Sequence, residues 1–278
     1  MLWFRKLGTR EQAIVLSCFF SVIIVLVLII GYFIPDTAIM TDLTNINEAP
    51  GLKHIFGTDW VGRDMLLRTT KGLSLSIKVG LLCSITSSIV AVVLGIIGPI
   101  FGGIVDWIIS FLVDLVMSIP HTILVILISI ACGGGFKGIV VGVSITHWTS
   151  LTRVIRAEVL QTMESEYVKV AYRLGKSKLS VCVNHLVPHI IPQLIVGTVL
   201  IFPHAIIHEA SLTFLGFGLP PHEPAIGVIL AESMKYLTSG QWWLAVFPGA
   251  TLVIMSVIVS LVGHSLQKII DPATAYKI

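Results

Sequence analysis

The sequence predicts an all-α integral membrane protein with six transmembrane helices, because its composition is strongly apolar and its apolar runs are long. Of the 278 residues, 55% are hydrophobic and only 12% are charged, and the mean hydropathy is +0.95. A soluble domain carries about 25% charged residues, so this chain has too little charge to cover a folded surface in water. The composition therefore excludes a soluble globular enzyme, a disordered chain and a fibrous repeat.

The first two spans are predicted from uncharged runs, each longer than the roughly 20 residues that a membrane-crossing helix needs. The first runs from Gln12 to Pro35 behind a short basic head that contains Arg5 and Lys6. It is too long for the apolar core of a signal peptide, so we expect an uncleaved helix. Residues 36–73 contain Pro, Gly, Asn and charges of both signs, which places them outside the bilayer. The second span runs from Val79 to Val105.

The next two spans contain polar residues. The third ends at Cys132 and contains Asp114 and Pro120. A carboxylate deep in hydrocarbon costs about 2.5 kcal/mol or more, so we place Asp114 near the membrane surface rather than in a gate. The fourth span begins at Gly138 and reaches the basic residue Arg153.

The last two spans are the fifth, from Leu186 to His208, and the sixth, within Trp242 to Gln267. A second outside loop, from Glu209 to Gln241, separates them. An even number of spans places both termini on one side of the membrane. Lys and Arg are more frequent in the segments on that side, so the positive-inside rule predicts a multi-pass protein of the cell membrane with cytoplasmic N- and C-termini.

A short amphipathic helix is predicted in the cytoplasmic stretch after the fourth span. Tyr167, Val170, Ala171 and Leu174 recur at i, i+3, i+4 and i+7, the spacing of one helix face. Gly175 would end this helix by adopting a left-handed conformation. The pattern is compatible with a face that lies on lipid headgroups or on the chain's own helices, and equally with a face that fills a groove on a partner.

The same stretch resembles the "EAA" loop of ABC importer permeases, although Val170 stands where that family usually has Ala. The residues that carry the resemblance are Glu166-Tyr167-Val168-x-x-Ala171-x-x-x-Gly175 and, nine residues later, His185-Leu186-Val187-Pro188. In that family the loop forms a coupling helix that docks in a cleft of a cytoplasmic ATPase. The resemblance therefore implies that six residues couple the chain to an ATPase: Glu166, Tyr167, Val170, Ala171, Leu174 and Gly175.

Two further motifs resemble the dipeptide, oligopeptide and nickel group of these permeases, and in particular the second (C-type) permease of such importers. One lies in the first outside segment, His54-x-x-Gly57-Thr58-Asp59-x-x-Gly62-Arg63-Asp64. The other lies toward the C-terminus, Ser211-x-x-Phe214-Leu215-Gly216-x-Gly218 with Pro220-Pro221, Phe247-Pro248-Gly249 and Asp271-Pro272. The chain departs from the group at Phe111, where an Arg is frequent, and at Ile226, where a Trp is common.

This resemblance implies a type I ABC importer permease fold with a cytoplasmic coupling helix. Residues 1–73 would be an N-terminal transmembrane anchor plus an extracytoplasmic segment, 74–267 a five-helix core permease domain and 268–278 a cytoplasmic tail. The implied partners are a homologous permease subunit, cytoplasmic ATP-binding subunits, an extracytoplasmic substrate-binding protein and membrane lipid, with no nucleic acid. Gly175-Lys176-Ser177 lacks the earlier Gly of a phosphate-binding loop, so the chain is expected to be no enzyme, to need no cofactor and to rely on partners for ATP hydrolysis.

The candidate cargo residues are His204, His208 and Glu209 on the predicted fifth span. The two histidines share a helix face at i, i+4, and imidazole suits Ni, Zn and Cu. They are compatible with a transient metal site on the translocation path and with hydrogen-bonded contacts between helices. His147 is read as a core histidine and only secondarily as a third ligand, and His121 as lining a kink.

Nickel members of the group look similar around Pro-His-x-x-x-His, which favours nickel or a chelated transition metal as the cargo. Import of di- or oligopeptides by the same architecture is the alternative. An ion-coupled secondary transporter is more distant, because such a protein is expected to have repeated halves and charged residues at mid-span.

Overall fold

The computed structural model describes residues 8–270, and within that range the secondary structure is helical with no strand. The all-α prediction is thereby confirmed for the described residues. The residues outside this range include Arg5, Lys6, the Asp271-Pro272 motif and most of the predicted tail. The long helices are α1 (Thr9–Phe33), α2 (Met65–Phe101), α5 (Gly135–Met163), α8 (Val187–Phe214) and α10 (Trp243–Ile270). The shorter elements are η2 (Asp36–Ile39), α3 (Gly103–Ser118), α4 (His121–Ala131), α6 (Glu166–Arg173), α7 (Lys178–Val181), η3 (Cys182–Leu186), α9 (Ile226–Ser233) and η4 (Met234–Ser239).

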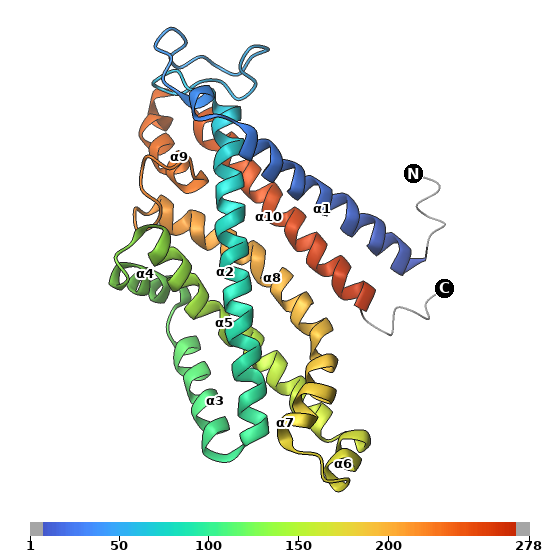
Figure 1. Cartoon of the computed structure of the whole chain (residues 1–278). Helices are drawn as coiled ribbons and strands as arrows, with labels where there is room; N and C mark the ends of the chain where they lie inside the picture. Colours follow the sequence, from blue (N-terminus) through green and yellow to red (C-terminus); the bar gives the residue numbers. More distant parts are fainter. Residues whose placement is uncertain (1–7, 271–278) are drawn as a thin grey trace.

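Helix α2 runs through the length of the molecule and packs along α5 and α8 (Figure 1). Glycines allow these close approaches: a side chain at Gly95 would meet Ile155 of α5, and one at Gly80 would meet Ile206 of α8. Helices α1 and α10 lie side by side in opposite directions, so the beginning of α1 and the end of α10 are at the same end of the pair (Figure 1).

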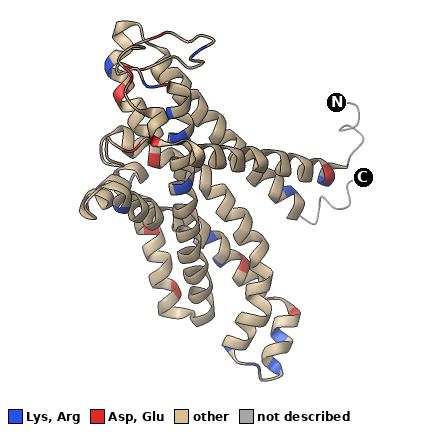
Figure 2. Cartoon of the chain, turned by 45° about the horizontal axis from the view of Figure 1, so that its top comes forward, with Lys and Arg blue, Asp and Glu red and all other residues tan. Residues whose placement is uncertain are grey.

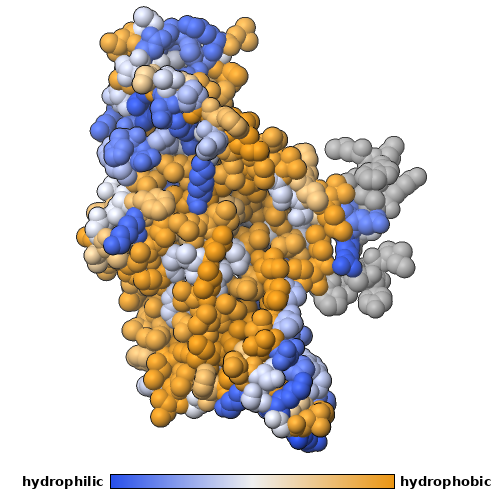
Figure 3. Space-filling model, in the orientation of Figure 1, coloured by the Kyte–Doolittle hydropathy of each residue, from blue (hydrophilic) through white to orange (hydrophobic). Residues whose placement is uncertain are grey.

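Polar and apolar surfaces are segregated along the molecule. Hydrophilic side chains gather at the end that carries residues 36–64 and at the opposite end around α6, and a broad apolar band lies between them (Figure 3). Figure 2 shows the same division in the charges, with few charged residues along the long helices. Two polar ends and an apolar band between them are the surface of a protein that crosses a membrane.

The number of spans is confirmed only in part. Four helical stretches of the described residues are long and apolar enough to cross a membrane: Arg10–Phe33, Met65–Phe101, Lys178–Phe214 and Trp243–Ile270. Helices α3 and α4 would add a fifth as one broken span, although they are bent by 100°. Pro120 explains the break, because it holds Ile119 in an extended conformation that no helix can continue.

Helix α5 is long enough to span but is too polar to qualify by hydropathy. Arg153 of α5 pairs with Asp114 of α3 at 2.5 Å. Arg156 of α5 donates two hydrogen bonds, of 2.6 and 2.7 Å, to the carboxylate of Asp106 in α3. Such groups are tolerated when they face protein rather than lipid, so the six-span arrangement stays a prediction. The Asp114 carboxylate is 66% exposed on this chain, and its position near the membrane surface stays a prediction.

The predicted starts of two spans are wrong. The second span was predicted from Val79, but α2 begins at Met65, because the Asp64 carboxylate accepts bonds from the backbone N–H groups of Leu66 and Leu67 and caps the helix. Helix α2 therefore continues across the boundary placed after residue 73. The fifth span likewise extends back to Lys178 through a π-helical turn.

Candidate functional site

A cavity of about 740 Å³ opens between the end of α3, the start of α4 and the middle parts of α5 and α8. Its apolar wall includes Leu151 and Leu200, and its polar groups include Ser150, Thr149 and Gln193. No carboxylate is among the described residues that line it. The cavity is therefore a mostly apolar pocket with uncharged polar groups and, as described next, four histidines.

Three of these histidines come together from three helices: His121 at the start of α4, His147 in α5 and His208 in α8. The ring centroids of His121 and His147 are 4.5 Å apart, those of His121 and His208 4.5 Å, and those of His147 and His208 5.1 Å. One nitrogen from each ring lies within 4.8 Å of the other two. We call these residues the histidine triad.

Hydrogen bonds fix which nitrogens of the histidine triad remain available. Nδ1 of His147 is 2.9 Å from the carbonyl oxygen of Val143 in the preceding turn. A carbonyl only accepts, so this Nδ1 carries a proton, and Nε2 of His147 keeps its lone pair. Nδ1 of His121 is buried and has no hydrogen-bond partner. The triad thus presents imidazole nitrogens that the protein itself does not satisfy.

The predicted cargo residues divide into those that line the cavity and one that does not. His208 belongs to the histidine triad, and His204 lines the same cavity one helical turn away. Glu209 is fully buried and is not a cavity-lining residue. Its Oε1 accepts a bond of 2.9 Å from the hydroxyl of Thr213, which in turn accepts one from the backbone N–H of Leu219. The contacts of Glu209 therefore hold the chain that follows α8.

His121 was predicted only to line a kink and His147 to be a core histidine, and the structure places both in the wall of the cavity. The only sequence signal for His121 was Pro120, which marks the break that turns its side chain into the cavity. His147 lies on a long helix among Thr and Ser residues, and the sequence contains nothing that pairs it with residues 26 positions before and 61 positions after it.

The amphipathic helix is present as α6, but the structure divides its predicted apolar face. Tyr167, Val170 and Leu174 are 49%, 47% and 76% exposed. Ala171, predicted to share their face, is 5% exposed and packs with Val168 into the chain's own core. Ala171 lies at the edge of the apolar stripe, one helical turn from the buried Val168, so the core covers that edge and leaves the other edge open. The chain itself therefore covers most of Ala171, and the predicted contact of Ala171 with an ATPase stays a prediction.

Gly175 ends α6 as predicted, with φ at +81°. The backbone N–H of Gly175 donates to the carbonyl of Tyr172, and that of Lys176 donates to the carbonyl of Ala171. This pair of bonds is the Schellman motif, which needs a left-handed residue and therefore favours glycine. At the other end of α6, Glu166 lies 3.6 Å from Lys169. The hydrogen bond from Lys169 to Glu164 raises the pKa of the lysine.

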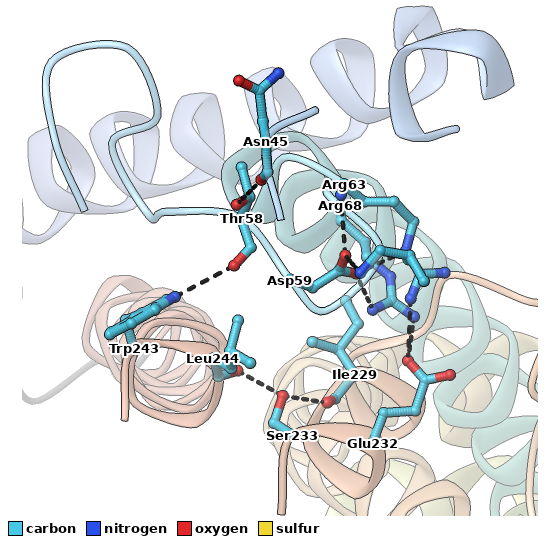
Figure 4. A network of polar contacts seen from close by, with 11 residues as sticks. Asn45, Thr58, Asp59, Arg63, Arg68, Ile229, Glu232, Ser233, Trp243 and Leu244 are labelled. Atoms are coloured by element: carbon cyan, nitrogen blue, oxygen red, sulfur yellow. Dashed lines mark hydrogen bonds and ion pairs between the residues drawn. The ribbon is translucent and has the colours of Figure 1, made fainter. Parts of the chain in front are cut away.

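The segment predicted to lie outside is held to α2 and α9 by four charged residues that we call the outer clamp: Asp59 and Arg68, which are buried, and Arg63 and Glu232, which are partly exposed (Figure 4). Asp59 accepts bonds from Nε of Arg63 at 2.6 Å and from Arg68 at 3.2 Å, and Arg68 also pairs with Glu232. The indole N–H of Trp243 donates to the carbonyl of Thr58, which attaches the same loop to α10. The motif at residues 54–64 is thus a structural joint between the two loops that the sequence predicts to lie outside the membrane.

Comparison with known proteins identifies the class to which this fold belongs. Residues 88–276 match the family described as "Binding-protein-dependent transport system inner membrane component", which covers more than half of the chain. The chain belongs to this family, and it is an ABC importer permease of the peptide and nickel group. The family is a membrane permease subunit rather than an enzyme, and ATP-binding subunits and a substrate-binding protein are its implied partners.

Three curated relatives show the similarity in more detail. The chain is 30% identical over 225 residues to a putative peptide transport system permease protein of Brucella suis, covering 81% of this chain and 75% of that protein. It is 29% identical over 269 residues to the dipeptide transport system permease protein DppC of Bacillus subtilis, covering 96% and 84%. It is 31% identical over 255 residues to the oligopeptide transport system permease protein OppC of the same organism, covering 90% and 83%.

Proposed function

We propose that the chain is one of two permease halves of an ATP-driven peptide importer, and that its cavity forms part of the translocation path. The observation that carries the proposal is the connection between α6 and the cavity. Helix α5 lines the cavity and ends at Met163, just before α6 begins at Glu166, and the helical stretch that leads into α8 starts at Lys178, just after α6 ends. A displacement of α6 therefore moves both helices that line the cavity.

The open face of α6 is the surface proposed to meet an ATPase subunit. Tyr167, Val170 and Leu174 are large and exposed. Helix α6 lies at a polar end of the molecule, where no hydrocarbon would cover these side chains (Figure 3). The inner face, with Val168 and Ala171, transmits force because it is packed into the core. The cavity is open at the surface of this chain, between its helices. The homologous permease subunit would cover this opening.

The cargo that the relatives favour is a peptide. The three relatives described above are named for peptide, dipeptide and oligopeptide transport. Pockets for small ligands measure about 300–1,000 Å³, and a cavity of about 740 Å³ on one half of the path suits a short peptide. The names of the relatives and the size of the cavity therefore favour the peptide alternative over the nickel cargo expected from the sequence. The histidine triad is the one observation that favours a metal.

The function is tested by reconstituting the whole importer, with both permeases, the ATPase subunits and the binding protein, in lipid vesicles. We expect a labelled dipeptide to accumulate when ATP is present on the side of α6, and ADP to support no accumulation. The control is a pH or sodium gradient without ATP, which should drive no uptake. Uptake driven by such a gradient alone would contradict the importer and would favour a secondary transporter.

The proposed orientation predicts which surfaces an impermeant thiol reagent reaches. We expect Leu52→Cys, in the first outside segment, to react in intact cells, and Leu179→Cys, in α7, to react only after lysis. Both side chains are exposed, so burial does not distinguish them. The measurement is labelling in a background without the native cysteines, Cys18, Cys83, Cys132 and Cys182. Labelling of Leu179→Cys in intact cells would contradict the proposed orientation.

A further inference from the structure

We propose that the histidine triad, His121, His147 and His208, is a binding site for one late first-row transition-metal ion inside the cavity. The residues come from three separate helices, and each offers one ring nitrogen within 4.8 Å of the others. Two imidazole nitrogens on a tetrahedral Zn²⁺ ion are about 3.4 Å apart. Small rotations about the side-chain bonds would shorten the nitrogen–nitrogen distances from within 4.8 Å to about 3.4 Å. The arrangement is therefore a three-nitrogen metal site in its metal-free geometry.

The protonation pattern fits a metal better than a hydrogen-bonded core. Nδ1–H of His147 donates to the Val143 carbonyl at 2.9 Å, which holds the ring in place and leaves Nε2 free. A histidine ligand usually donates its second ring N–H to a carbonyl or carboxylate in this way. Buried Nδ1 of His121 has no partner, which is costly unless something fills the space between the rings. A cation held by the triad would provide a partner for imidazole nitrogens that the protein does not satisfy.

The surroundings select the kind of metal. Among the described residues, the cavity lining has imidazole, hydroxyl and amide groups but no carboxylate. Mg²⁺ and Ca²⁺ need oxygen ligands and usually carboxylates, whereas imidazole suits Ni²⁺, Zn²⁺ and Cu²⁺. Three neutral imidazoles also leave the coordination of such an ion incomplete on the side of the cavity, where His204 lies one helical turn from His208.

The incomplete coordination indicates how the metal would arrive. An ion held by three protein ligands keeps a position for a further ligand, and amines and carboxylates of a short peptide or amino acid are suitable donors. This part of the inference rests on the proposed function: the importer would then accept a transition metal that is chelated by a small peptide-like ligand. Metal binding itself requires only the triad and can be measured without transport.

The test is metal binding to the purified importer complex, isolated through an affinity tag that contains no histidine. Equilibrium dialysis with Ni²⁺ should give one ion per copy of this chain. Co²⁺ should give visible absorption bands typical of nitrogen ligands. We expect His147→Gln and His208→Gln each to weaken Ni²⁺ binding about tenfold or more, a loss comparable to or larger than that from disturbing a ligand's supporting contacts.

The matched control is His264→Gln. His264 is an exposed histidine of α10 that bonds to the Ser260 carbonyl at 2.8 Å and does not line the cavity, so its loss should leave binding unchanged. Elution of each variant as an assembled complex shows that weaker binding is not misfolding. If the wild-type complex takes up neither Ni²⁺ nor Co²⁺ at micromolar concentrations, or if both triad variants bind Ni²⁺ as tightly as the wild type, the metal site is wrong.

The result is separable from the importer function. ATP-driven dipeptide uptake with no metal binding would overturn the metal site and leave the importer standing. Metal binding that depends on the triad, in a complex that fails to import peptide, would support the site and refute peptide transport. Uptake of a Ni²⁺–dipeptide complex that is lost in His208→Gln, while uptake of a metal-free dipeptide persists, would support both.

Discussion

Replacing Asp59 by alanine is expected to destabilise the outer end of the protein by about 3–5 kcal/mol, the usual cost of removing one partner from a buried ion pair. Asp59 is fully buried, and its carboxylate accepts bonds from Arg63 and Arg68 and from the backbone N–H of Val61 (Figure 4). Arg68 is only 3% exposed, so the variant leaves a buried guanidinium with Glu232 as its one remaining acidic partner. The backbone of the loop loses its acceptor in the same step.

The measurement is the thermal stability of the purified complex together with the rate of proteolysis in residues 36–64. The control is Asp36→Ala. Asp36 also forms an ion pair, with Lys71, but the carboxylate is 87% exposed, and exposed pairs contribute about 0–1 kcal/mol. Asp59→Asn should fall between the two, because it keeps acceptor capacity and loses the charge. Equal effects of Asp59→Ala and Asp36→Ala would show that burial of the outer clamp does not stabilise this end.

The outer clamp also illustrates what the sequence could not predict. Long uncharged runs predict α1 and α10 well, because lipid exposure demands apolar residues on nearly every face. The beginning of α2 was predicted to be part of a loop because it contains Arg68 and Lys71, and charges are costly in a span. Their partners, Glu232 and Asp36, come from other segments, so only the folded chain reveals that the charges are satisfied.

The effects of the prolines and the contacts of the histidines could not be predicted from the sequence either, because they too depend on packing between helices. Pro120 breaks the chain between α3 and α4, yet Pro192, Pro203 and Pro248 lie inside helices. Neighbouring helices can satisfy the backbone groups that a proline frees, so the outcome depends on packing rather than on local sequence. The histidine triad likewise needs three helices in register, whereas the i, i+4 pair of His204 and His208 was visible because it depends on one helix alone.

The sequence predicted that the amphipathic helix α6 exists and where it ends, but not which of its faces packs against the core. The helical spacing of the apolar residues predicted that the helix exists, and Gly175 predicted where it ends, because both signals are local in the chain. Which edge of the apolar stripe faces the core depends on how α6 meets α5 and the stretch leading to α8. That distinction leads to the largest effect on transport that we expect.

We expect Leu174→Asp to abolish ATP-driven uptake while the permease still folds and assembles. Leu174 is 76% exposed, so a carboxylate there remains in water in the isolated chain but would have to be buried in an apolar ATPase groove. Ala171→Asp should instead reduce the yield of folded complex, because it buries a charge in the chain's own core beside Val168. The comparison of two aspartates on one short helix separates docking from folding.

Uptake and ATP hydrolysis per assembled complex, with yield from size-exclusion chromatography, measure both effects. Gly175→Val provides a third case: a side chain there meets open space, so its effect comes only from forcing a β-branched residue to a φ of +81°. It should therefore loosen the end of α6 and lower transport without the loss of yield expected for Ala171→Asp. Wild-type uptake by Leu174→Asp would place the ATPase contact elsewhere. A normal yield for Ala171→Asp, together with lost uptake, would instead return Ala171 to the docking face, because a residue whose charge the fold tolerates but transport does not must lie against the partner.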